Sequence, residues 1–144
     1  MGSFIENFHD ENALRKFALL NAKSIVQQMI DDRSQNAVAI AEAYLNGEVS
    51  QNDLERAYSD ADAAHDKIVA AHMSDNDPTQ SEETAECAAL VAMWAVYPVG
   101  HTGVSPISSA RDAALHTAYY CFHIKGLRAL EEQIPRFRES GLIQ

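Results

Sequence analysis

The stretch from Asp31 to His72, DDRSQNAVAIAEAYLNGEVSQNDLERAYSDADAAHDKIVAAH, decides the fold, because it carries the start and stop signals of two helices. Asp31 offers a short carboxylate side chain of the kind that caps free backbone N–H groups at a helix N-terminus. Gly47 ends the first helix, since glycine readily adopts the left-handed conformation common just past a helix end. Ser50 opens the second helix, with Asp53 three residues later in a variant of the capping box. The two helices are therefore joined by a short turn and are expected to pack side by side.

The rest of the sequence continues this helical pattern, and no stretch alternates apolar and polar residues as a half-buried strand would. Further helices are predicted over about 10–30, 79–95, 105–125 and 127–137. The helix that contains Trp94 is apolar on nearly every side, so we expect it to be the most buried element. Small residues, mostly alanine, line the expected buried stripes and allow helix axes to approach closely. The sequence thus predicts an all-α, single-domain bundle of five to six close-packed, alanine-rich helices.

Length and composition are those of one globular domain. The chain of 144 residues is long enough to bury a sizeable core, and we expect one domain over residues 1–144. Residues 1–9 and 139–144 are expected to be flexible, and Pro135 is expected to interrupt the last helix. The longest apolar run is too short to span a bilayer, and the N-terminus has no signal-peptide pattern. We therefore expect a cytoplasmic protein with no membrane partner.

Acidic residues are concentrated in the central part of the chain. The formal net charge is −10, yet residues 31–86 alone carry 14 acidic residues against Arg33, Arg56 and Lys67, a balance of −11. A field of that sign repels nucleic acid and anionic membranes, and it attracts basic partners and speeds their encounter. We therefore expect no nucleic-acid partner and a basic protein partner. The alternative is that the acidic surface only keeps the protein in solution.

The same stretch resembles a known family. The run DDR, then AIAEAYLNGEVS, then LERAY and DADAAH, is similar to the immunity proteins of the immunity-5-like helical family, with a looser likeness from about Ala13 to about Ile124. Ser34 stands where that family more usually has proline, and both residues suit a helix start. The resemblance implies a bacterial protein that binds and neutralises a protein toxin. It supplies no catalytic residue that could be carried over to this chain.

Acidic residues of the predicted hairpin are the candidate toxin contacts. Asp31, Asp32 and Arg33 would lie at the mouth of the hairpin, although a helix cap with a local salt bridge is the more ordinary interpretation. We expect the contact to be made by the acidic face as a whole, and a homodimer is compatible with such a face. The other candidates are the acids of the two hairpin helices and their turn: Glu42, Glu48, Asp53, Glu55, Asp60 and Asp62.

A metal- or ligand-binding bundle is the alternative function. Asp62 and His65 are three residues apart on one predicted helix, and Asp112 and His116 are four apart on another. If those helices faced each other, two carboxylates and two imidazoles could converge on a metal ion. The known bundle-core metal motifs use glutamates at fixed positions on four helices, which this chain lacks, so we expect no cofactor. No zinc-protease, phosphate-loop, nucleophile-elbow or paired-cysteine motif is present, so we expect no enzymatic activity.

Overall fold

The computed structural model describes residues 10–71, 79–99, 103 and 105–142, which form six α-helices and no strand. The expected all-α bundle of five to six helices is confirmed. In chain order the elements are α2 (Glu11–Ser24), the 3-10 helix η1 (Val26–Gln28), α3 (Asp32–Leu45), α4 (Gln51–Ala71), α5 (Gln80–Ala95), α6 (Pro106–Lys125) and α7 (Leu127–Ser140).

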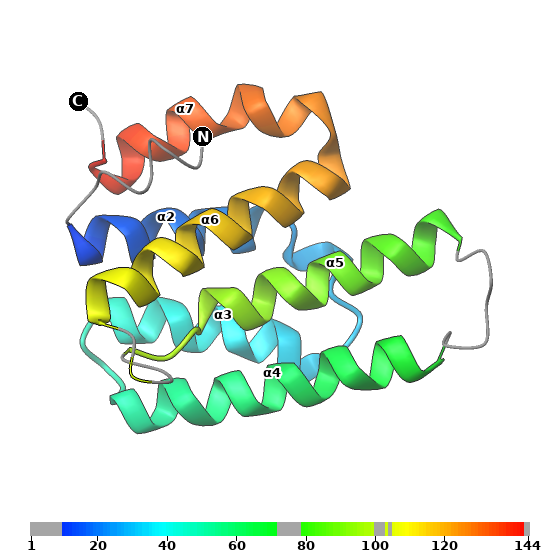
Figure 1. Ribbon diagram of the computed structural model, residues 1–144, viewed down its shortest axis with the longest axis horizontal. Coiled ribbons are helices and arrows are strands. Elements are labelled where there is room, and N and C mark those ends of the chain that lie inside the picture. Colours follow the sequence, from blue (N-terminus) through cyan, green and yellow to red (C-terminus); the bar gives the residue numbers. More distant parts are fainter. Residues whose placement is uncertain (1–9, 72–78, 100–102, 104, 143–144) are drawn as a thin grey trace.

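The helices are arranged around a central group formed by α2, α5 and α6 (Figure 1). Helix α5 packs against α6 on one side and α4 on the other, and it also contacts α2 and α3. Helix α7 packs on α2 and α6, whereas α4 packs on α3 and α5. Consequently α4 and α7 lie at opposite edges of the molecule, and α5 lies between α4 and α6 (Figure 1).

The turn between α3 and α4 is built as the sequence predicts. Gly47 has a φ of +73°, in the left-handed region, and its N–H donates to the carbonyl of Tyr44 at 3.1 Å. The Ser50 hydroxyl accepts from the N–H of Asp53 at 3.3 Å, and the Asp53 carboxylate accepts from the N–H of Ser50 at 2.9 Å. These bonds satisfy backbone groups at both helix ends, and α3 packs along α4. The predicted helix hairpin is confirmed.

Small side chains occupy most of the helix contacts. Larger side chains such as Phe17, Leu14 and Leu54 fill the remaining space and are almost completely buried. Alanine at a contact lets two helix axes approach closely, and dense packing of this kind supplies much of the dispersion energy of a core. The alanines with no exposed surface are Ala18, Ala22, Ala37, Ala61, Ala64, Ala88, Ala92, Ala110, Ala113 and Ala114.

A buried polar link joins α2, α6 and α7. The side-chain amide of Asn21 donates to the Thr117 hydroxyl at 3.3 Å and accepts from the Arg136 guanidinium at 2.8 Å. Arg136 also donates to the Glu132 carboxylate, which accepts from the Lys125 ammonium at 2.9 Å. These bonds pair the buried Asn21 and Arg136, whose polar groups would otherwise lose their hydration without compensation. They also hold the C-terminal helix in one orientation.

Two expectations about buried helices need correction. The first helix was expected to run to about Ile30, but α2 ends at Ser24 and η1 follows, which places both Ile25 and Met29 in the core. The most buried helix is α2 and not α5, because eight of the 14 residues of α2 are buried against six of the 16 in α5. The first turns of α5 extend, together with the end of α4, beyond the other helices (Figure 1).

The last helix differs from the expectation at Pro135. Pro135 was expected to interrupt the last helix, but it lies inside α7, which continues through it to Ser140. Pro135 and Glu131, four residues earlier, are both exposed residues. Residues 139–144 were expected to be flexible, and this stays a prediction. Within that range, α7 continues to Ser140 and Leu142 is buried beside Phe137. Residues 1–9 and 143–144, the other parts of the expected flexible ends, lie outside the described residues.

The contact between α2 and α7 yields a stability prediction. The rings of Phe17 and Phe137 are stacked, with centroids 4.3 Å apart and planes inclined by 6°, and Phe17 is fully buried. Phe17→Ala is expected to lower the free energy of unfolding by about 3–5 kcal/mol, because it removes the stack and leaves a cavity. Ile134→Ala, at a position 55% exposed on the same helix as Phe137, is the control and should cost less than about 1 kcal/mol. Urea denaturation followed by circular dichroism measures both; similar losses would show that the α2–α7 contact is not part of the core.

Candidate partner-binding surface

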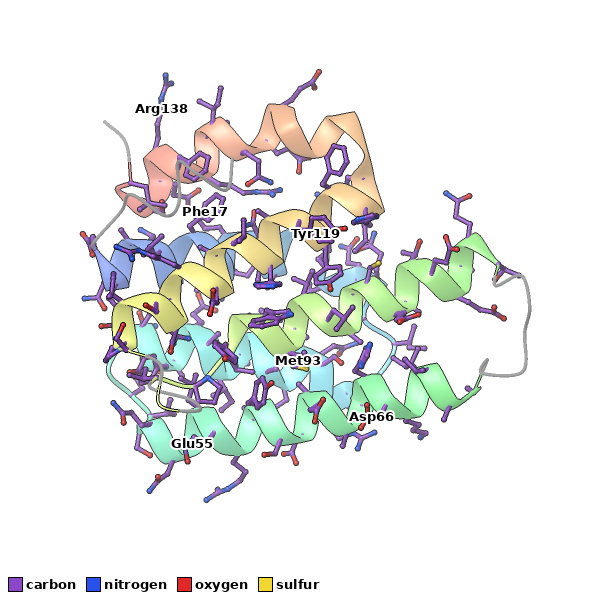
Figure 2. The ribbon with its side chains drawn as sticks, viewed as in Figure 1. Phe17, Glu55, Asp66, Met93, Tyr119 and Arg138 are labelled. Atoms are coloured by element: carbon purple, nitrogen blue, oxygen red, sulfur yellow. The ribbon has the colours of Figure 1, made fainter. Side chains whose placement is uncertain are left out.

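Exposed carboxylates lie along the outer side of α4. Leu54, Ala57, Ala61, Ala64 and Ile68 form its buried stripe, and the helical period places polar residues on the opposite side. Glu55, Asp62 and Asp66 are all exposed there, and Figure 2 shows Glu55 and Asp66 on this helix at the edge of the molecule. The helix therefore presents a row of negative charge to the solvent.

The negative charge continues onto α5. His65 is mostly buried between the two helices, with its Nδ1 3.8 Å from the Asp66 carboxylate and its Nε2 3.7 Å from the Glu86 carboxylate. Glu83, one turn before Glu86 on α5, is exposed. His65 therefore lies between a carboxylate of α4 and a carboxylate of α5, and we call the carboxylates on this side of the two helices the acidic band. Its members are Glu55, Asp62, Asp66, Glu83 and Glu86.

Asp31, which was expected at the mouth of the hairpin, serves α3 itself. Its carboxylate accepts from the backbone N–H of Arg33 at 2.9 Å and forms an ion pair with the Arg33 guanidinium at 2.9 Å. These bonds lower the pKa of Asp31 from 3.8 to about 2. Asp32 beside it is exposed in the first turn of α3. The cap with a local salt bridge, which was the more ordinary interpretation, is the arrangement that the structure has for Asp31 and Arg33.

The remaining candidate residues fall into two groups. Glu42 pairs with Lys23 at 3.0 Å, and Asp53 caps α4, so these two carboxylates already have partners within the chain. The others are exposed and form no ion pair within the described part of the chain: Asp32, Glu48, Glu55, Asp60 and Asp62. Those in the second group are the ones whose charge is available to another molecule.

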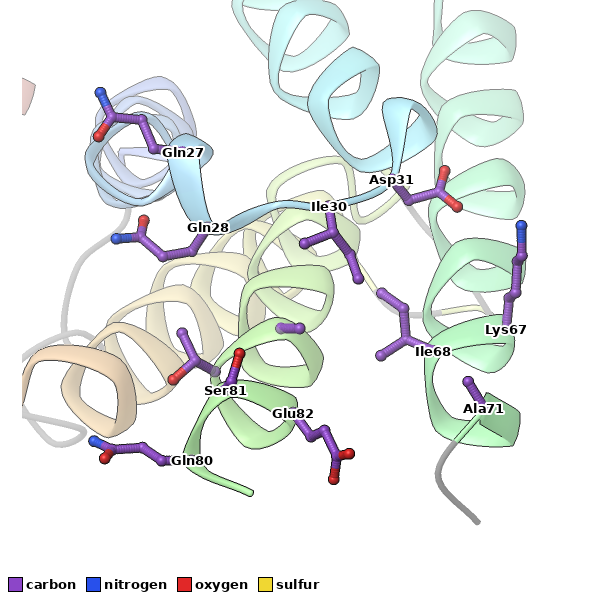
Figure 3. A pocket seen from close by; sticks show the side chains of 12 residues that line it. Gln27, Gln28, Ile30, Asp31, Lys67, Ile68, Ala71, Gln80, Ser81 and Glu82 are labelled. Carbon is purple, nitrogen blue, oxygen red and sulfur yellow. The ribbon is translucent and has the colours of Figure 1, made fainter. Parts of the chain in front are cut away.

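A groove of about 810 Å³ opens beside the hairpin mouth, between η1, the start of α3, the end of α4 and the start of α5. Figure 3 shows Ile30 and Ile68 pointing into it, with Lys67 and Glu82 at its rim. Ile30 is 70% exposed and adds apolar surface to the groove. The rim carries both signs of charge, so its electrostatics favour neither a basic nor an acidic ligand.

The four-residue metal site of the alternative function is not assembled. Asp62 and His65 lie on α4 and Asp112 and His116 on α6, and α5 separates these two helices. The imidazole of His116 is stacked on Trp94 of α5, with ring centroids 3.8 Å apart, and its Nδ1 lies 2.7 Å from the backbone carbonyl of Asp112. The two pairs therefore do not converge on one point, as the alternative function would require.

One smaller group on α4 has ligand atoms close together. Single ligand atoms of Asp62, His65 and Asp66 all lie within 4.8 Å of one another, and both carboxylates are exposed. Exposed carboxylates on one helix hold a divalent cation weakly unless further ligands enclose it. This arrangement is better described as part of the acidic band than as a metal centre.

Comparison of the chain with protein-family models, with curated proteins and with solved structures finds no match in any of the three. Within the described residues, none of the helices is long and apolar enough to cross a membrane.

The Asp31–Arg33 pair yields a pH prediction. Because the folded state lowers the pKa of Asp31 to about 2, its charge stabilises the fold above about pH 4, and this contribution is lost as the pH falls from about 4 to about 2. Asp31→Asn keeps a capping oxygen but removes the charge. The variant should be less stable than the parent at about pH 7, and the difference should shrink toward about pH 3. Urea unfolding at several pH values, with Asp32→Asn as the control, measures this; a pH-independent difference would contradict the ion pair.

Proposed function

We propose that this protein is a bacterial immunity protein that binds a basic protein toxin through the acidic band and so neutralises it. The observation that carries this proposal is a set of four exposed carboxylates and one half-buried carboxylate, Glu86, on the adjacent helices α4 and α5. Helix α5 has no lysine or arginine. The sequence resemblance to immunity-5-like proteins supports the toxin as the class of partner. The proposed activity is binding alone, so it needs neither a catalytic residue nor a cofactor.

The physical basis of the proposed inhibition is electrostatic complementarity. A surface of one sign attracts a partner of the other sign over about a Debye length, which is roughly 8 Å at physiological salt, and so raises the association rate. Once bound, the helices would cover the basic surface that the toxin uses for its own target. Such covering would take place in the cytoplasm, where an immunity protein meets a toxin before it is released or after it enters.

The acidic band lies far from the exposed carboxylates of α7, so those carboxylates provide a matched control for the proposal. Asp62 and Asp66 belong to the band on α4, whereas Glu131 and Glu139 are exposed on α7 at the opposite edge (Figure 1). Reversing either pair changes the net charge by the same amount. The two double variants therefore separate the effect of position from the effect of total charge.

Co-expression with the product of an adjacent toxin-like gene tests the proposal. The parent protein should rescue growth and co-purify with that product. Asp62→Lys/Asp66→Lys should weaken the complex at least about tenfold, because it places like charges opposite each other, and it should lose the rescue. Glu131→Lys/Glu139→Lys should behave like the parent. Equal binding by both double variants would show that the acidic band does not make the contact.

A further inference from the structure

A second groove, of about 480 Å³, lies between α5 and α6, where the acidic band ends. Glu83 and Glu86 contribute carboxylates from α5, and Tyr120 and His123 contribute aromatic rings from α6. Leu90 of α5 and Ile124 of α6 add apolar surface. The helical period explains the set, since Glu83, Glu86 and Leu90 share one side of α5, and Tyr120, His123 and Ile124 share one side of α6. Negative charge, aromatic faces and apolar surface therefore meet in one concave site.

The aromatic wall of this groove is part of a larger cluster on α6. The ring centroids of Tyr120 and His123 are 6.4 Å apart, and Tyr119 packs edge-on against both rings. Tyr120 is partly buried, and burial together with nearby groups that include Glu86 raises the pKa of its phenol. The phenol is therefore neutral at physiological pH and offers an electron-rich ring face beside the glutamates.

The groove does not have the arrangement of a metal site. Cys87 lines it, but burial and the neighbouring Glu86 and Glu83 raise the pKa of the thiol, whereas a metal ligand must be a thiolate. Among the described residues, the group of three close metal-binding side chains is the one on α4 and not one in this groove. The carboxylates of Glu83 and Glu86 give the groove an excess of negative charge, which disfavours an anionic ligand. The chemistry that fits is a cation with an apolar stem.

We propose that this groove receives an arginine side chain of the protein partner. The methylene stem of the arginine would pack on Leu90 and Ile124, and its guanidinium would lie over the ring of Tyr120 within reach of Glu83 and Glu86. Guanidinium groups stack on aromatic faces and bind carboxylates through two parallel hydrogen bonds, which an ammonium group cannot do. The inference deepens the proposed function, because it names the side chain by which the basic partner would be anchored at the end of the acidic band.

The test uses a hexa-arginine peptide and the full-length protein labelled with ¹⁵N. The largest amide shifts on titration should map to the walls of the groove on α5 and α6. Tyr120→Leu should weaken peptide binding roughly threefold to tenfold, because it removes the cation–π contact. Phe122→Leu is the matched control, since Phe122 is 38% exposed on the same helix but does not line the groove. That variant should bind like the parent.

Two results would overturn the inference: shifts confined to α4, or equal weakening in both aromatic variants. A second readout avoids substitutions. Alkylation of Cys87, which lines the groove, should slow severalfold when the peptide is bound, whereas an unchanged rate would contradict occupancy of the groove. Cys121 does not interfere because it is fully buried, and burial raises its pKa to about 11.

Failure of the arginine anchor can be distinguished from failure of the immunity proposal. If the toxin complex forms and depends on Asp62 and Asp66 but not on Tyr120, the immunity proposal stands and the arginine anchor is wrong. If the peptide occupies the groove but no adjacent toxin-like product binds, the arginine site stands and the immunity proposal is wrong.

Discussion

The close contact of helices along alanine-lined faces is the constraint on which the rest of this structure depends. Ala61 and Ala64 of α4 and Ala88 and Ala92 of α5 have no exposed surface, so these two helices pack closely and most of their charged side chains lie on their outer sides. Two such helices, packed together, bring their acidic outer sides next to each other. The mutual repulsion of these carboxylates costs stability, which the packing offsets, and residues that oppose folding in this way often serve binding.

The parts of the fold that were predictable from sequence are those set by short-range hydrogen bonds. The cap at Asp31, the glycine turn at Gly47 and the reciprocal bonds of Ser50 and Asp53 each involve groups only a few residues apart. The helix ends that these groups set can therefore be predicted without knowledge of the tertiary structure. The effect of Pro135 was not predictable in this way, because α7 continues through it although a proline inside a helix removes one backbone hydrogen bond.

The candidate site was predictable only in part, because some of its residues come together only through the packing of different helices. The acids of α4, such as Glu55 and Asp62, follow from charge and helical period. The contribution of Glu83 and Glu86 requires α5 to lie beside α4, and the groove with Tyr120 requires α6 to lie on the other side of α5. The acidic excess of the sequence continues as far as Glu86, and this signal could have led us to include Glu83 and Glu86 among the predicted contact residues. The separation of α4 from α6 also explains why Asp62 and Asp112 do not meet.

The central claim is that a basic partner covers one side of the molecule, the side formed by the acidic band and the adjoining groove. Hydrogen–deuterium exchange on the co-purified complex, compared with the free protein, tests this claim most directly. The account predicts slower exchange in peptides from α4, from the first turns of α5 and from the end of α6, with α7 beyond Glu131 unchanged. Slower exchange confined to α2 and α7, at the opposite edge of the bundle, would contradict it.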